Sequence, residues 1–187
     1  MIRRLITLAC VAGLALFAAT ARPKAGEVVP WQGLFISAAG PRWVDRAAQV
    51  QAESGFNADA VSYCGALGPA QWMPSSWADA VKKGWARPGS SPRDPAAAIP
   101  AQHAYMLWLE GFCGGLNPAL GGYNAGAGSI RKAQRLAADL GMTDPDAWLR
   151  TLPRVTGAGH AGETRGYIQH NANFRAQIRA RLSIQGS

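Results

Sequence analysis

Apolar residues in this chain of 187 residues recur at helical spacing, and no stretch shows sustained alternation between apolar and polar residues. The clearest case begins at about Glu163, where helical spacing puts six residues on one face: Tyr167, Ile168, Asn171, Phe174, Ile178 and Leu182. The pattern predicts a mainly α fold. Because 48% of the residues are apolar, the chain can bury a core, which excludes a disordered protein.

Glycine and proline mark where the predicted helices begin and end. The expected segments are 41–53, about 76–83, 95–110 with a kink or delayed start at Pro100, 130–140, a short one opened by Asp144-Pro145, and the last from about 163. The expected N-caps include Ser75 or Ser76, and Ser129. Residues 22–40 are rich in proline and glycine and are expected to be a tether. Residues 41–187 are expected to form one domain without internal repeats.

The N-terminal segment is typical of an export signal. Arg3 and Arg4 precede an uncharged run from Leu5 to Ala21, which ends in the small-x-small pattern Ala19-Thr20-Ala21. We expect residues 1–21 to be a signal peptide cleaved after Ala21, so that the mature protein lies in the periplasm or the cell-wall space. An uncleaved N-terminal anchor is the alternative, although the run is at the short edge of what spans a bilayer.

The chain is basic, with 19 Lys plus Arg against 11 Asp plus Glu and a formal charge of +8. This balance indicates an anionic partner, which can be nucleic acid, a membrane surface or an acidic polymer. The basic residues are scattered, and the cluster of Arg175, Arg179 and Arg181 is more typical of a solvated helix face. We therefore do not expect nucleic acid to be the partner.

The cysteine count changes if the leader is removed. Cleavage would delete Cys10 and leave Cys64 and Cys113, and an even count in an exported chain predicts a disulfide between them. Two small buried thiols are the alternative. No H-x-x-x-H or C-x-x-C spacing occurs, so neither a metal site nor any other cofactor is expected.

Glu53 stands out among the four glutamates of the chain. It lies at the end of an Ala-rich predicted helix, in Gln51-Ala52-Glu53-Ser54-Gly55-Phe56. A carboxyl group with apolar neighbours has a raised pKa and can stay protonated near neutral pH. Protonation of a glycosidic oxygen requires such an acid. The alternative is an ordinary surface glutamate on a helix.

Four segments follow one another in a specific order: Glu53–Asn57, Gly65–Trp77 with Ser62 just before it, Gly122–Gly126 and Glu163–Tyr167. Their order and spacing resemble the catalytic domain of the soluble lytic transglycosylases, which are relatives of goose-type lysozyme. The resemblance covers about residues 41–180 and implies a lysozyme-like helical domain with a substrate cleft. Pro69-Ala70 and Trp72 depart from the usual Leu-Met and Ile of the family at the floor of the cleft.

The resemblance also implies the roles of single residues. Glu53 matches the single catalytic acid and base of the family. The matching substrate-binding residues are Ser62, Gln71, Met73, Tyr123, Asn124, Glu163 and Tyr167. Plainer alternatives remain for three of them, because Ser62 can be a turn residue, Gln71 can satisfy backbone groups and Tyr123 can belong to the core.

The implied activity is cleavage of the β-1,4 bond between N-acetylmuramic acid and N-acetylglucosamine in peptidoglycan, with formation of a 1,6-anhydro end. A lysozyme-like hydrolase and a non-catalytic wall-binding or assembly protein are the alternatives. The expected partner is the glycan strand, and we expect a monomer. The sequence is compatible with three biological roles: wall turnover, a wall-spanning secretion or conjugation apparatus, and phage lysis. It is also compatible with exo or endo cleavage of the glycan strand.

Overall fold

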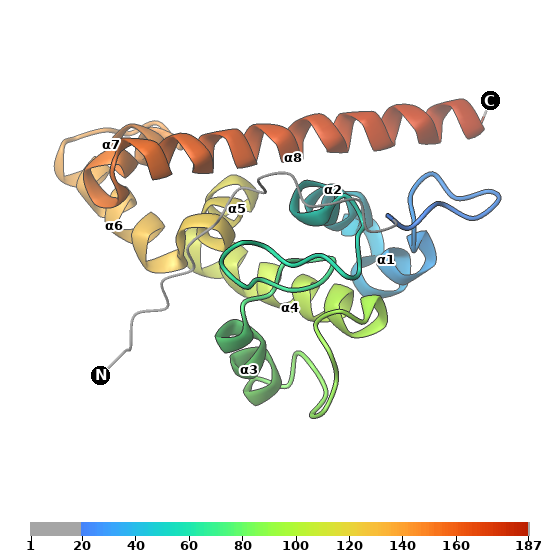
Figure 1. Ribbon diagram of the computed structural model, residues 1–187. Coiled ribbons are helices and arrows are strands. Elements are labelled where there is room, and N and C mark those ends of the chain that lie inside the picture. Colours follow the sequence, from blue (N-terminus) through green and yellow to red (C-terminus); the bar gives the residue numbers. More distant parts are fainter. Residues whose placement is uncertain (1–19, 187) are drawn as a thin grey trace. The chain divides into compact units, whose positions relative to one another are not determined.

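The computed structural model describes residues 20–186, which are mainly helical (Figure 1). The α-helices are α1 Gln32–Ala39, α2 Trp43–Ser54, α3 Pro74–Lys82, α4 Pro95–Cys113, α5 Leu116–Ala125, α6 Ala127–Asp139, α7 Ala147–Thr156 and α8 Ala158–Gln185, with a 3₁₀ turn, η1, over Gly40–Arg42. Over the same residues there is no β-strand, and only two isolated bridges join Leu67 to Val61 and to Trp72. The prediction of a mainly α fold is confirmed.

The chain divides into two compact units. Of the described residues, 20–105 and 170–186 form the first, which we call the Glu53 unit. Residues 106–169 form the second, which we call the Asn124 unit. Helices α4 and α8 each contribute one part to each unit.

The core of the Glu53 unit is built around α2. Ala47, Ala48 and Val50 of that helix are fully buried, as is Phe35 of α1. The prediction that residues 22–40 form a tether is therefore wrong from Val28 onward. Val28 and Val29 are buried and α1 begins at Gln32, because burying these apolar side chains outweighs the poor helix propensity of the neighbouring prolines and glycines.

Helix α2 begins and ends close to where the sequence predicts. Pro41 lies in the 3₁₀ turn that leads into it. Gly55 ends it in the left-handed conformation at φ 61°, and the Gly55 N–H donates to the Gln51 carbonyl at 3.0 Å. Two other helices begin earlier than predicted. The caps are Met73 for α3 and Gly126 for α6, rather than the nearby serines.

The Asn124 unit depends on glycines for close helix packing. A Cβ atom on Gly121 of α5 would lie 2.9 Å from Cη2 of Trp148, whose ring is buried on α7. The sequence Leu116–Ala125 contains two glycines, a proline and two asparagines, and no helix is predicted there. Tertiary packing forms α5 in spite of this low propensity.

Cys113 is a free, buried thiol, so the predicted disulfide between Cys64 and Cys113 is wrong. The physical reason is the direction in which α4 turns its last residue. A Cβ on Gly122 would lie 3.3 Å from Cys113 Sγ, so the thiol packs against α5 as a small apolar group. Burial raises the pKa of Cys113 to about 11, and the nearby charge of Arg131 opposes this.

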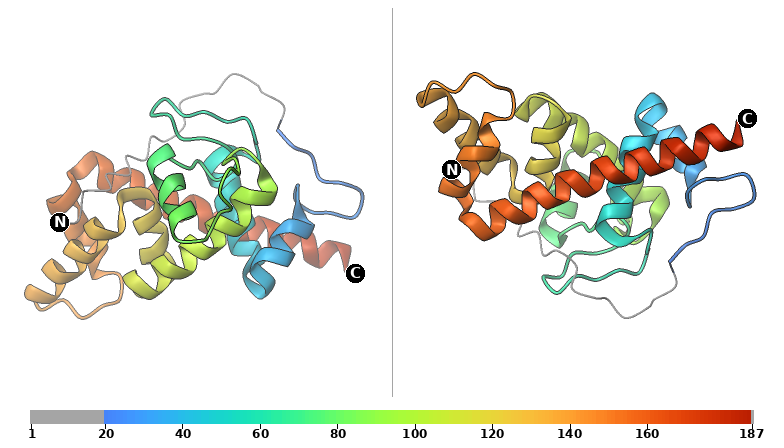
Figure 2. Two further views of the ribbon diagram at one scale, coloured as in Figure 1. Left: turned by 90° about the horizontal axis from the view of Figure 1, so that it is seen from below. Right: turned by 90° about the horizontal axis from the view of Figure 1, so that it is seen from above.

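Helix α8 spans 28 residues and is unbroken in the view from above (Figure 2). It begins at Ala158, five residues before the predicted start. Within residues 20–186, no helix combines the length and the apolar character needed to cross a membrane. The predicted leader, residues 1–21, lies outside the described residues except for Thr20 and Ala21.

Candidate active site

Glu53 lies in the last turn of α2 and is partly exposed. Its neighbour Ser54 joins the end of the helix to the segment that follows. The Ser54 hydroxyl donates to the Pro69 carbonyl at 2.9 Å and accepts from the Asn57 N–H at 3.1 Å. The helix end that carries Glu53 is thereby connected to both ends of the loop formed by residues 55–73.

The other acids of the Glu53 unit are engaged in local ion pairs or backbone caps. These contacts are Glu27 with the Lys24 N–H at 3.1 Å, Asp45 with Arg175 at 3.7 Å, Asp59 with Arg93 at 3.8 Å, Asp79 with Lys82 at 4.0 Å, and Asp94 with the Ala96 N–H at 2.9 Å. These contacts account for the acids of this unit other than Glu53. Glu53 is the acid candidate because of its place in the predicted motif, at the end of α2.

A buried arginine lies on α2 two turns before Glu53, and sequence reasoning did not single it out. Arg46 is fully buried, and its Nε–H donates to His103 Nδ1 on α4 at 3.2 Å. Because Nδ1 accepts this hydrogen bond, it carries no proton, and the ring proton of neutral His103 is on Nε2. This contact joins α2 to the first part of α4 within the Glu53 unit.

The 55–73 loop contains left-handed backbone at residues that do not favour it. Phe56 has φ 63° and Gln71 has φ 47°. For residues with a Cβ atom this conformation costs about 1–2 kcal/mol each. Such strain persists only where surrounding contacts determine the backbone, and it is frequent at functional sites. The loop is therefore held in its shape by contacts rather than by local preference.

Ser62 closes a turn within this loop. Its backbone N–H donates to the Ala66 carbonyl, and its hydroxyl oxygen accepts from the Ala66 N–H, each at 2.9 Å. Ser62 is therefore a turn residue, one of the two interpretations that the sequence allows. A hydroxyl that accepts in this way still carries its own proton, which can be donated to a ligand.

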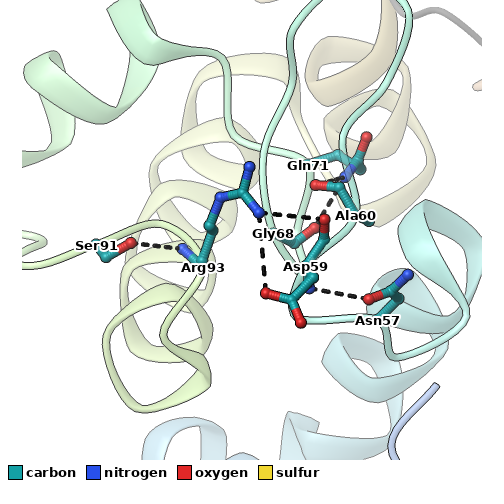
Figure 3. Close-up of polar contacts among 7 residues, drawn as sticks. All are labelled: Asn57, Asp59, Ala60, Gly68, Gln71, Ser91 and Arg93. Atoms are coloured by element: carbon teal, nitrogen blue, oxygen red, sulfur yellow. Dashed lines mark hydrogen bonds and ion pairs between the residues drawn. The ribbon is translucent and has the colours of Figure 1, made fainter. Parts of the chain in front are cut away.

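The side chain of Gln71 points back into the loop (Figure 3). Its Nε2 donates to the Gly68 carbonyl at 2.9 Å and to the Ala60 carbonyl at 3.5 Å. The amide nitrogen thus satisfies backbone groups, as the plainer interpretation of the sequence proposes. Met73 is half-buried at the N-cap of α3, where its carbonyl accepts from the Trp77 N–H at 2.9 Å.

Tyr123 and Asn124 lie at the end of α5 and are buried, with 7% and 5% of their surface exposed. The Thr164 hydroxyl on α8 contacts Asn124 Oδ1 at 2.7 Å and the His160 carbonyl at 2.9 Å. A hydroxyl has one proton, so it donates to only one of these two oxygens at a time. Asn124 is fixed by a partner that is itself fully buried.

Glu163 and Tyr167 lie on the same helix as Thr164. The Glu163 side chain is 45% exposed and its Oε2 lies 3.3 Å from His160 Nδ1, whereas Tyr167 is buried. Sequence reasoning missed Thr164 and His160. The signal was present, because His160, Glu163, Thr164 and Tyr167 follow the spacing of one helix face.

The predicted site residues thus fall into two groups. Glu53, Ser62, Gln71 and Met73 belong to the Glu53 unit, and Tyr123, Asn124, Glu163 and Tyr167 belong to the Asn124 unit. Over residues 20–186, no group of three or more His, Cys, Asp or Glu side chains is arranged to hold a metal ion.

Residues 47–143, more than half of the chain, match the transglycosylase SLT domain family. The chain belongs to the transglycosylase SLT domain family. The matched segment of the SLT domain includes Glu53 and the loop after it, and it extends through α5 and α6 to residue 143.

Solved structures of lytic transglycosylases are similar to this SLT domain. The 70 kDa soluble lytic transglycosylase SLT70 from Escherichia coli matches 82% of the chain at 25% identity with a TM-score of 0.67, and a complex of the 70 kDa enzyme with bulgecin A matches similarly. An inactive mutant of the lytic transglycosylase Slt from Pseudomonas aeruginosa, in which a glutamate is replaced by glutamine, matches 82% at 25% identity with a TM-score of 0.66. The chain spans 24% of the length of these proteins.

Proposed function

We propose that this protein is a lytic transglycosylase that cleaves the β-1,4 bond between N-acetylmuramic acid and N-acetylglucosamine in peptidoglycan, with Glu53 as its catalytic acid and base. The observation that carries the proposal is the place of Glu53 within the SLT match, at the end of α2, where Ser54 joins the helix to a strained loop. The glutamate-to-glutamine change in the inactive Pseudomonas relative supports the use of one glutamate.

The mechanism follows from having one acid. Most glycosidases use two carboxylates that flank the bond, whereas the motif pattern of this chain supplies the single glutamate Glu53. Glu53 protonates the glycosidic oxygen, and the C1–O bond breaks as the acetamido carbonyl of the sugar stabilises the positive charge at C1. The Glu53 carboxylate then takes the proton of the C6 hydroxyl, and the oxygen attacks C1. The product is a 1,6-anhydro ring, and no water is consumed.

The remaining predicted residues have binding roles in this proposal. Ser62 can donate its hydroxyl proton to the acetamido group of the sugar. Asn124 binds the glycan strand through its amide nitrogen, because Thr164 contacts its amide oxygen. Tyr123 packs against the sugar. Gln71 and Met73 shape the substrate-binding surface of the Glu53 unit, and Glu163 and Tyr167 bind the glycan strand from the Asn124 unit.

The test is the substitution Glu53→Gln. Glutamine keeps the size of the side chain and a hydrogen-bonding head, but it cannot donate and recover the proton. General acid–base catalysis contributes about 10²- to 10⁴-fold, and here one residue has both roles. Cleavage of purified sacculi should therefore fall by at least this factor, while binding to sacculi and folding are retained. Glu27→Gln and Glu110→Gln are the controls and should keep near-normal turnover.

Mass spectrometry of the products separates the transglycosylase from a hydrolase on the same fold, because an anhydro end is lighter by one water. Wild-type cleavage by Glu53→Gln would overturn the assignment of the acid. Absence of cleavage by the wild type, with binding retained, would favour a wall-binding or assembly protein.

The proposal includes export. The pattern of residues 1–21 and a substrate outside the cytoplasm both favour a leader that is cleaved after Ala21. N-terminal sequencing of the protein from the periplasmic fraction should then begin at Arg22. A chain that begins at Met1 in a membrane fraction would instead support the anchor.

A further inference from the structure

A short segment before α4, residues 90–93, lies against the loop that follows Glu53 (Figure 3). Nη1 of Arg93 donates to the Asp59 carbonyl at 3.3 Å and lies 3.8 Å from the Asp59 carboxylate. One hydrogen bond closes a turn within the segment, and another joins the segment to α3. The Arg93 N–H donates to Ser91 Oγ at 3.1 Å, and the Trp77 indole N–H of α3 donates to the Ser90 carbonyl at 3.1 Å.

Gly68 is the second place where the segment and the loop meet. It has φ 75°, and a Cβ atom there would lie 2.0 Å from the Pro92 carbonyl oxygen and 2.9 Å from Cα of Arg93. The two backbones approach so closely that only glycine fits. The same glycine accepts the Gln71 side-chain amide on its carbonyl. The segment therefore contacts the loop at Asp59 and at Gly68, on either side of Ser62.

These contacts have a mechanical role because the loop is strained. Phe56 and Gln71 are both in the left-handed region, one near each end of the loop. Strained backbone relaxes unless external contacts determine it. We infer that Arg93 is a positioning residue, which with residues 90–92 holds the Asp59–Gln71 loop in the conformation that presents Ser62 to the sugar. This inference rests on the proposed function.

The inference predicts which kinetic constant changes. If only a fraction of the molecules has the loop in the binding conformation, the apparent affinity falls by that fraction. Glu53 is held by α2 itself, whose last turn is closed by the hydrogen bond from the Gly55 N–H to the Gln51 carbonyl. Loss of the Arg93 contact should therefore raise KM by about three- to tenfold, the equivalent of one hydrogen bond, and leave kcat within about twofold.

The experiment compares three variants on soluble, uncrosslinked peptidoglycan strands at a temperature where all are folded. Arg93→Ala should show the full rise in KM. Arg93→Lys should restore part of it, because an ammonium group can still donate to one oxygen. Asp59→Asn is the matched control. It removes the ion pair but keeps the backbone carbonyl that Arg93 contacts, so its KM should stay near the wild-type value.

Hydrogen exchange without substrate distinguishes positioning from direct contact with substrate. In Arg93→Ala, the amides of Ser62, Gly68 and Trp72, which are hydrogen-bonded within the loop, should exchange faster than in the wild type. An unchanged KM would overturn the inference, and so would a raised KM with unchanged exchange. Gly68→Ala provides a second route, because its Cβ must displace Pro92, and it should raise both KM and loop exchange.

The inference and the proposed function fail in different ways. If Glu53→Gln cleaves strands normally, the proposed function is wrong. If Glu53→Gln is inactive and Arg93→Ala has wild-type KM and exchange, only the positioning role of Arg93 is wrong.

Discussion

The 55–73 loop and helix α5 present polar groups by opposite means. The loop turns through left-handed backbone at Phe56 and Gln71, and hydrogen bonds from side chains to backbone hold its shape. Helix α5 is regular, and it presents Asn124 from a backbone that needs no such contacts. Its position depends instead on Gly121 and Gly122, which let buried neighbours approach closely.

The difference shows where each region is vulnerable. A region held by a few directional hydrogen bonds weakens when a donor is removed, and added volume disturbs it only where two backbones meet closely, as at Gly68. A region held by close packing of helices weakens when volume is added. Substitutions of the two kinds should therefore have different effects in the two regions.

The largest effect is expected from added volume in α5. Gly121→Val would place its side chain against Trp148 and Ile130, both buried, and should lower the free energy of unfolding by about 3 kcal/mol. Gly128→Val is the control on α6, because a Cβ there meets nothing within 4 Å, and its effect should be within about 0.5 kcal/mol. Urea denaturation measures both. Equal effects would show that α5 is not closely packed.

The next effect tests whether α5 also depends on a hydrogen bond. Thr164→Val keeps the shape of the side chain but removes its contact with the buried Asn124 amide oxygen. An unpaired buried oxygen should cost about 1–3 kcal/mol. Thr164→Ser keeps the hydroxyl and should recover most of this loss in thermal unfolding. If Thr164→Val is as stable as the wild type, Asn124 is fixed by packing alone.

A smaller effect is expected where the loop joins α2. Ser54→Ala removes the donor to the Pro69 carbonyl and the acceptor for the Asn57 N–H. The free energy of unfolding should fall by about 1–2 kcal/mol, and the amides of the loop should exchange faster. Ser75→Ala, at an exposed position on α3, is the control and should leave both measurements unchanged.

The smallest effect is expected at a partly exposed contact between Glu163 and His160 on α8. Glu163→Gln removes the charge that lies 3.3 Å from His160, and with almost half of the side chain exposed this should change the free energy of unfolding by less than about 0.5 kcal/mol. A loss above 1 kcal/mol in urea denaturation would show that the pair holds the start of α8 in place.

The same contrast explains which parts of the fold could be predicted. Helix α2 was predictable because its apolar stripe and Gly55 are local signals. Two regions carry only weak local signals for secondary structure. They are helix α5 and the segment around Val28 and Phe35, which was expected to be a tether. They are fixed by tertiary burial, which no short window of sequence contains.

The order of the motifs singles out Glu53 as the candidate acid, and this assignment stays a prediction. The contacts that support the site were less predictable, because the amide nitrogen of Gln71 holds backbone carbonyls in the loop. Thr164 stood within a recognised segment, but its hydrogen bond to Asn124 joins residues that are 40 apart in sequence. The predicted disulfide between Cys64 and Cys113 was wrong because an even number of cysteines does not show which way each side chain points. Helix α4 turns Cys113 inward.

The buried thiol of Cys113 is a probe for local opening of the Asn124 unit. An alkylating reagent needs a thiolate that it can reach, and burial of Cys113 with a pKa of about 11 denies it both until the unit opens. The labelling rate of Cys113 in the native protein then measures how often α4 and α5 separate. The raised pKa also has a cost in alkali. The unfolded thiol ionises near 9.0, so the free energy of unfolding should fall as the pH rises from there to about 11, and Cys113→Ala should lack this fall.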